Sequence, residues 1–160
     1  MSLFQDKDKF LRQAARQALW LPAAATQTVN LGRPEIERLI PHRAPFLLVD
    51  AITAVDYEQQ ALAGVRRINP DDPVFAGHFP GNPILPGVVL LDAMLQAIAA
   101  ATGIALDACE IGAVKFLSPA GPGDELEIRH SPSAGGAIAF EVMAGGRRIA
   151  SGSVNPGTPR

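Results

Sequence analysis

The sequence has 160 residues, 48% of them hydrophobic and 19% charged, which suits one soluble globular domain. Its formal net charge of -2 offers no basic surface of the kind that nucleic-acid binding requires, so we expect no nucleic-acid partner. Cys109 is the single cysteine, the opening residues do not resemble a signal peptide, and Asp92 and Gln96 interrupt the apolar run after Pro86. We therefore expect a cytoplasmic protein without a membrane span.

The chain is expected to divide into residues 1–33 and a main domain at residues 34–160. In the first part, apolar residues recur at helical spacing between Phe10 and Leu19, which predicts an amphipathic helix. An Ala/Thr-rich connector follows this helix up to residue 33.

The main domain is expected to be α+β, with one long helix among several strands. Prolines between residues 70 and 86 favour a stiff loop, and the glycine pair at 145–146 predicts a hairpin turn. The expected elements are a short helix at 34–40, strands at 46–55 and 61–68, a helix at 86–102, and strands at 110–117, around 126–128, at 138–142 and at 147–154. The long helix is apolar on all sides and must be buried on nearly every side. We expect a curved, antiparallel sheet wrapped around this central helix.

Asp92 and Gln96 are the polar residues inside the apolar helix, and they lie four positions apart, hence on one face. A carboxylate in a dry interior is costly unless it is paired, hydrated or protonated. The pair therefore indicates either a polar cavity or a contact with polar groups of a second subunit.

His78 lies in the segment GHFPGNP at residues 77–83, between a glycine and an aromatic residue. A rigid, proline-rich backbone is suited to hold a general base in place, and histidine accepts a proton near neutral pH. The alternative is a histidine that only packs against its own loop.

The segment GHFPGNPILPGV at residues 77–88, followed by Asp92 and Gln96, resembles the signature of the β-hydroxyacyl-acyl-carrier-protein dehydratases of bacterial fatty acid synthesis. The likeness extends to PHRAPFLLVD at 41–50, to KFLSP at 115–119 and to a Gly-Asp pair at 123–124, and so covers roughly residues 36–154. It implies a hot-dog fold, in which an antiparallel sheet wraps a long central helix.

The resemblance also implies a role for each matching residue. His78 would take the α-proton, Asp92 would help the 3-hydroxyl leave as water, and Gln96 would hold the Asp92 carboxyl in place. The backbone N–H of Gly87 would polarise the thioester carbonyl, as helix N-termini can. The expected substrate-binding residues are Phe79, Pro80, Gly81, Val88, Lys115 and Phe116.

The resemblance implies conversion of (3R)-hydroxyacyl thioesters into trans-2-enoyl thioesters in fatty acid or related polyketide or polyene synthesis. The substrate would be carried on the phosphopantetheine of acyl carrier protein, and the enzyme would need no cofactor of its own. His42, His78 and His130 show no metal-ligand spacing, so we expect no metal. A homodimer is implied in which His78 of one chain meets Asp92 of the other, with a trimer of dimers as the larger assembly.

Several alternatives stay open. The dehydratase-only branch usually has glutamate at the position of Asp92, whereas aspartate is typical of the bifunctional branch, which also isomerises the double bond. A hot-dog acyl thioesterase and a non-catalytic acyl-chain-binding partner are the other readings. The motif leaves the acyl chain length and the pathway open.

Overall fold

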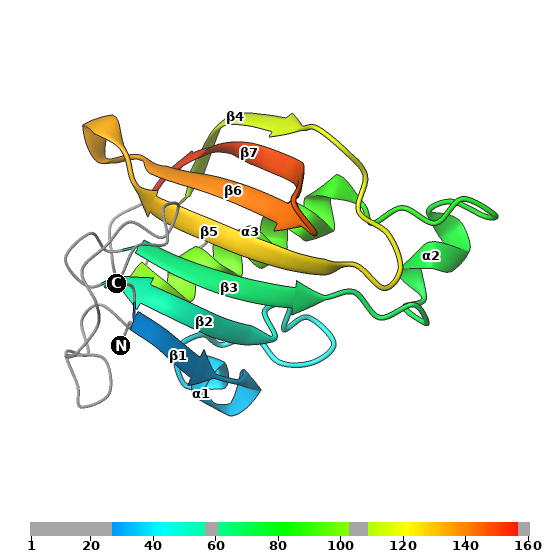
Figure 1. Ribbon diagram of the computed structural model, residues 1–160, viewed down its shortest axis with the longest axis horizontal. Coiled ribbons are helices and arrows are strands. Elements are labelled where there is room, and N and C mark those ends of the chain that lie inside the picture. Colours follow the sequence, from blue (N-terminus) through cyan, green and yellow to red (C-terminus); the bar gives the residue numbers. More distant parts are fainter. Residues whose placement is uncertain (1–26, 57–60, 103–108, 157–160) are drawn as a thin grey trace.

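The computed structural model describes residues 27–56, 61–102 and 109–156. Within these ranges, seven strands form one antiparallel sheet in the order β1-β2-β3-β5-β6-β7-β4 (Figure 1). The elements are β1 (Gln27–Leu31), α1 (Arg33–Glu37), β2 (Ala51–Asp56), β3 (Ala61–Arg67), α2 (Val74–Gly77), α3 (Gly87–Thr102), β4 (Glu110–Phe116), β5 (Glu125–Pro132), the single turn η2 (Ala134–Gly136), β6 (Ile138–Ala144) and β7 (Arg147–Asn155). The expected α+β arrangement is confirmed.

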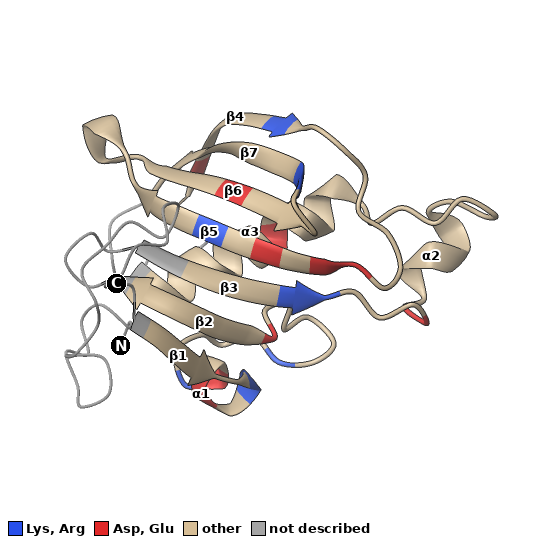
Figure 2. Cartoon of the chain, viewed as in Figure 1, with Lys and Arg blue, Asp and Glu red and all other residues tan. Residues whose placement is uncertain are grey.

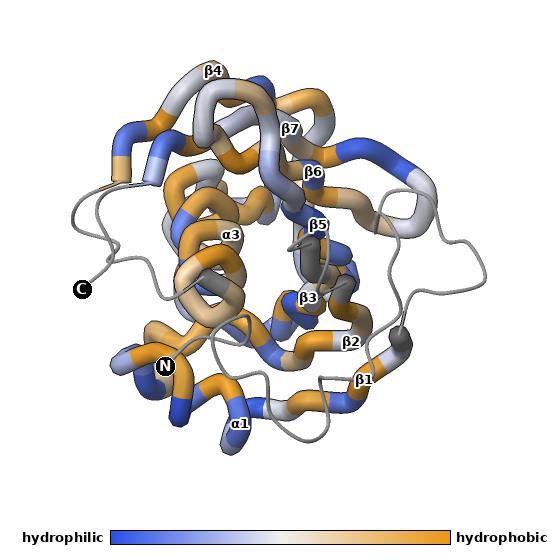
Figure 3. Tube along the Cα trace, turned by 90° about the vertical axis from the view of Figure 1, so that its left-hand side faces the viewer, coloured by the Kyte–Doolittle hydropathy of each residue, from blue (hydrophilic) through white to orange (hydrophobic). Residues whose placement is uncertain are grey.

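Helix α3 lies in the hollow of the curled sheet, as an end-on view of the helix makes plain (Figure 3). Small side chains let it approach β3 closely, because a Cβ placed on Gly64 would lie 3.9 Å from the Cβ of Ala97. The helix is buried on all sides from Ala97 to Ala101. Its first half is less covered, and Val88 there is 72% exposed. The expectation of nearly complete burial therefore holds for the second half alone.

Strands β5 and β6 alternate between buried and more exposed residues, as a half-buried sheet requires. On β5, Leu126 and Ile128 face the core, whereas Glu127 and Arg129 lie outside and form a bidentate ion pair at 2.9 and 3.0 Å. Figure 2 shows such charges on the strands and loops, while Asp92 is the single charged residue of α3. Between β6 and β7 the glycine pair at 145–146 has φ angles of 53° and 78°, which confirms the predicted turn.

Three sequence-based expectations were wrong in detail. Strand β1 pairs with β2, so residues 27–31 belong to the sheet, although they were expected to be part of a connector. The proline-rich loop contains the short helix α2, and residues 46–50 precede β2 rather than belonging to it. The helix expected between Phe10 and Leu19 lies outside the described residues. No helix in the described ranges has the length and apolarity to cross a bilayer.

His130 is the most unusual residue of the core. It lies on the inner side of β5, is fully buried, and neither ring nitrogen has a hydrogen-bond partner. Burial lowers the pKa of His130 from 6.5 to about 4, because the charged ring would lose its hydration. The Ala97 carbonyl, which lies outside hydrogen-bond geometry, opposes this pKa shift only in part.

We expect the free energy of unfolding to fall as the pH is lowered from 6.5 to about 4. In this range the unfolded chain takes up a proton at His130 and the folded chain does not, so the loss reaches about 3 kcal/mol. Above and below this pH range, His130 causes no further change in the free energy of unfolding. Urea unfolding of the wild type and of His130→Leu at several pH values checks it. The free energy of unfolding of the wild type should fall relative to that of His130→Leu as the pH is lowered through this window, and the difference should be constant outside it. Parallel curves at all pH values would contradict the prediction.

Candidate active site

A short loop after α2 holds His78 in place through its own backbone. The N–H of His78 donates to the Val74 carbonyl at 3.0 Å, and its carbonyl accepts from the Ile84 N–H at 2.9 Å. Within the loop, Phe79 and Asn82 exchange two N–H to carbonyl bonds, at 3.1 and 2.9 Å. Hydrogen bonds therefore close the loop at its base and across its middle, in addition to the restriction that its prolines impose.

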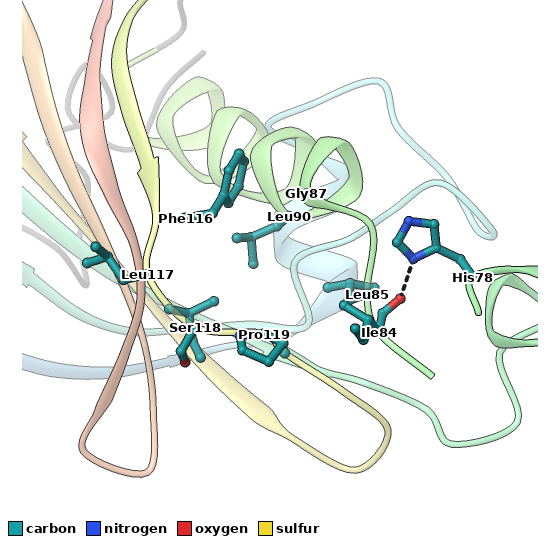
Figure 4. Close-up of a pocket in the computed structure, with 11 residues that line it drawn as sticks. His78, Ile84, Leu85, Gly87, Leu90, Phe116, Leu117, Ser118 and Pro119 are labelled. Atoms are coloured by element: carbon teal, nitrogen blue, oxygen red, sulfur yellow. Dashed lines mark hydrogen bonds between the residues drawn. The ribbon is translucent and has the colours of Figure 1, made fainter. Parts of the chain in front are cut away.

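The His78 ring has a defined tautomer. Its Nδ1 lies 2.8 Å from the carbonyl oxygen of Ile84, drawn as the dashed line in Figure 4. A carbonyl oxygen can only accept a hydrogen bond, so Nδ1 carries the proton and Nε2 keeps a lone pair. The ring also stacks on Phe79, with ring centres 4.1 Å apart. The ring is thus oriented so that Nε2, and not Nδ1, is the nitrogen that can accept a proton.

A pocket of about 480 Å³ opens beside His78 and reaches the start of α3 at Gly87 (Figure 4). Among the described residues, no hydrogen bond satisfies the N–H groups of Gly87 and Val88. Such free donors at a helix N-terminus, together with its partial positive charge, favour an oxygen that gains negative charge. The pocket therefore brings together a base and donors for an oxyanion.

Asp92 lies elsewhere. It is half-buried on the second turn of α3 and lines a second pocket of about 730 Å³, together with Arg66 and Asp72. The His78 pocket does not include Asp92, and the Asp92 pocket does not include His78. Within one chain the two predicted catalytic side chains therefore face different spaces.

Gln96 does not act on Asp92 as expected. Its side chain is fully buried, its Nε2 donates to the Phe46 carbonyl at 2.8 Å, and its Oε1 accepts from the Leu48 N–H at 2.8 Å. Both bonds fix the amide orientation. Because Phe46 and Leu48 line the Asp92 pocket, Gln96 supports one wall of that pocket rather than the carboxyl itself.

Two of the remaining predicted residues line a pocket. Phe116 lines the His78 pocket and Val88 the Asp92 pocket. Pro80 and Gly81 are exposed in the His78 loop, and Lys115 is exposed on β4 without lining either pocket. Several lining residues were not among the predicted site residues: Leu90, Ser118, Ala120 and Ile149 at the first pocket, and Arg66 and Asp72 at the second. In the described ranges, no three His, Cys, Asp or Glu side chains gather as a metal site.

Comparison with known families decides the relationship. A family model described as a FabA-like domain matches residues 40–153, and this range includes all the residues that line the two pockets. This chain belongs to the FabA-like family. The resemblance drawn from its motifs is thereby confirmed.

Curated relatives of this FabA-like protein are dehydratases by name. The 3-hydroxyacyl-[acyl-carrier-protein] dehydratase FabZ of Chlamydia trachomatis is 38% identical over 138 residues, which cover 78% of this chain and 90% of the relative. FabZ of Cereibacter sphaeroides is 39% identical over 122 residues, covering 71% and 78%. The expected activity class, dehydration of 3-hydroxyacyl thioesters, is confirmed by these relatives.

Solved structures support the hot-dog fold. The dehydratase heterocomplex ApeI:P from Xenorhabdus doucetiae aligns with a TM-score of 0.55 at 24% identity, covering 62% of this chain and 89% of that one. The erythromycin dehydratase aligns with a TM-score of 0.57 at 22% identity, covering 70% of this chain and 45% of that one. At these identities the likeness concerns the fold alone.

We expect Gln96→Met to destabilise the protein by about 2–4 kcal/mol, because a buried N–H and a carbonyl lose their partners. Met94→Leu on the same helix is the control, since it exchanges one fully buried apolar side chain for another at a cost below about 1.5 kcal/mol. Urea unfolding measures both. Equal losses in the two variants would show that these hydrogen bonds do not support the fold.

Proposed function

We propose that the protein removes water from (3R)-hydroxyacyl thioesters carried on acyl carrier protein and releases trans-2-enoyl thioesters. We further propose that each active site combines His78 of one chain with Asp92 of a second copy. The observation that carries the proposal is the Nδ1–H to Ile84 carbonyl bond, which leaves Nε2 of His78 as a base in a pocket that also contains the start of α3.

The first half of the reaction is supported within one chain. Nε2 of His78 takes the proton from C2 of the substrate, and the electron pair of that C–H bond moves toward the thioester carbonyl. The oxygen gains negative charge and accepts a hydrogen bond from the Gly87 N–H. Both groups line one pocket, so a single bound thioester can contact them together.

The second half requires an acid at C3. A protonated Asp92 donates its proton to the 3-hydroxyl, the C–O bond breaks, and water leaves. His78 then holds one extra proton and Asp92 lacks one, and a proton transfer between them through solvent restores both. The two residues face different pockets in one chain, which supports a second copy as the source of the acid for a given His78.

Exposed apolar residues around Asp92 support a homodimer as the source of that acid. Phe46, Val88 and Ile111 line its pocket and are 70%, 72% and 43% exposed. Such a cluster is typical of a surface that another protein covers. A two-fold axis would pair each Asp92 pocket with the other chain's His78 loop and create two equivalent sites.

Carrier-protein docking and a cytoplasmic location belong to the same proposal. Lys115 is exposed one residue before Phe116, and the half-exposed Arg147 donates a hydrogen bond to Ser118 at 2.8 Å beside the His78 pocket. These cations suit an acidic carrier protein, for which complementary charge mainly accelerates association. Bound phosphopantetheine would enter the protein as part of the substrate, with no resident cofactor.

We expect His78→Ala to reduce dehydration about 10²–10⁴-fold while the protein stays folded, because a general base is lost. The assay follows the conjugated enoyl product of a 3-hydroxyacyl thioester by absorbance, free thiol by a thiol reagent, and any cis-3 isomer by chromatography. His42→Ala is the matched control and should stay within about threefold of wild type, since His42 lines neither pocket. Thiol release without enoyl product would favour a thioesterase, and neither product would favour a binding protein.

Subunit mixing tests the shared site. His78→Ala and Asp92→Asn should each be nearly inactive alone. When they are mixed equally and allowed to exchange chains, half of the dimers contain both variants, and each of these has one intact site. Activity should return to about a quarter of wild type. Recovery near zero with exchange verified by mass spectrometry would place both residues of a working site in one chain.

A further inference from the structure

Phe116 makes an unusual contact with the start of α3. It is the last residue of β4, and although 55% exposed it lies against Gly87 (Figure 4). At the place where a side chain on Gly87 would begin, three carbons of the Phe116 ring lie at 2.9, 3.1 and 3.3 Å. Real Cβ atoms essentially never come this close to another atom, so the ring occupies the space that a methyl group would need.

The backbones on the two sides of this contact are held at a set separation. Phe116 pairs with Ala150 in the sheet, and the Leu117 N–H donates to the Ile149 carbonyl at 2.8 Å. On the other side, the segment before α3 is bound to the chain after β4 by the Leu85 N–H to Ala120 carbonyl bond, at 2.7 Å. Only the ring, half-exposed at its flexible end, is free to move.

We propose, resting on the function above, that Phe116 is a positioning residue that closes the thioester site over Gly87. The ring packs against the bare Cα of Gly87, and beside this contact the ring and the first turn of α3 wall the slot in which the thioester lies. It also shields the Gly87 N–H from water, which strengthens a hydrogen bond to an oxygen that gains charge. Glycine at position 87 therefore serves two purposes: it supplies the N–H, and it leaves room for the ring.

A double-mutant cycle on Gly87 and Phe116 tests the slot. Gly87→Ala keeps the N–H but places a methyl group where the ring lies, so kcat/KM should fall about ten- to a hundredfold as the ring is displaced. Phe116→Ala should cause a loss of similar size, and Phe116→Leu a loss of at most about threefold. In the double variant Gly87→Ala/Phe116→Ala the loss should be no greater than in Phe116→Ala alone, because no ring is left to displace.

Gly121→Ala is the matched glycine control. Gly121 also lies near this pocket, but a Cβ there would meet only the Pro83 carbonyl oxygen, at 3.4 Å, which leaves room for a methyl group. Its kcat/KM should stay within about twofold of wild type. Circular dichroism checks that each variant is folded, and if Gly87→Ala is not, the Phe116→Ala and Phe116→Leu pair still decides whether a bulky apolar side chain is required.

Binding of a saturated acyl-pantetheine thioester, measured by calorimetry, separates this inference from the proposed function. The ligand has no 3-hydroxyl and cannot be dehydrated, yet it should occupy the slot, and its Kd should follow the same non-additive pattern. The slot would be ruled out if the losses of the two single variants multiplied in the double variant. It would also be ruled out if Phe116→Ala bound the ligand as tightly as wild type, or if wild type did not bind the ligand. A wild type that binds the ligand in this pattern but dehydrates no 3-hydroxyacyl thioester would overturn the proposed function and leave the slot standing.

Discussion

The rest of the structure depends on one constraint, which is that helix α3 has to be covered by other parts of the protein. An α-helix with apolar residues on every side must be surrounded by protein. The curled sheet achieves this for the second half, where Ala97 and Ile98 are fully buried. It leaves the first half partly open, and there Gly87 and Asp92 line pockets. The proposed chemistry therefore lies where the helix emerges from the sheet, close enough to solvent for substrate to enter and apolar enough to strengthen each polar contact.

The polar residues of α3 have different fates although they share one face of the helix. Gln96 is enclosed, and both ends of its amide bind backbone groups of Phe46 and Leu48, so it is satisfied and structural. Asp92, one turn earlier, stays half-buried at an open pocket with the buried Arg66 among its lining. A buried amide is tolerated because two partners are within reach, whereas a carboxylate remains where water or a ligand can reach it.

Much of this could be predicted from the sequence where the signal is local. The bounds of α3, the turn at 145–146 and the His78 loop each depend on neighbouring residues, and the structure agrees with them. Strand β1 was missed because its alternation rests on two apolar residues alone, Val29 and Leu31, which is too short a pattern to predict a strand. The inward side of Arg66 could not be predicted, because it is set by pairing with Leu126, which faces the core, and register between distant strands is not visible in one sequence. The same limit applied to Asp92 and His78, whose spacing says nothing about which pocket each faces.

The catalytic groups divide according to what holds them. His78 is fixed by the carbonyl of Ile84, and the segment from Ile84 leads directly through Leu85, bonded to Ala120, into the first turn of α3. The base and the oxyanion donors therefore belong to one rigid frame, and their relative position does not depend on a second chain. The acid is different, because Asp92 faces another pocket with exposed apolar walls. In the proposed mechanism, removal of the C2 proton needs the groups of one chain, whereas loss of the hydroxyl needs Asp92 of a second copy, so complete turnover would depend on the oligomer as well as on the fold of one subunit.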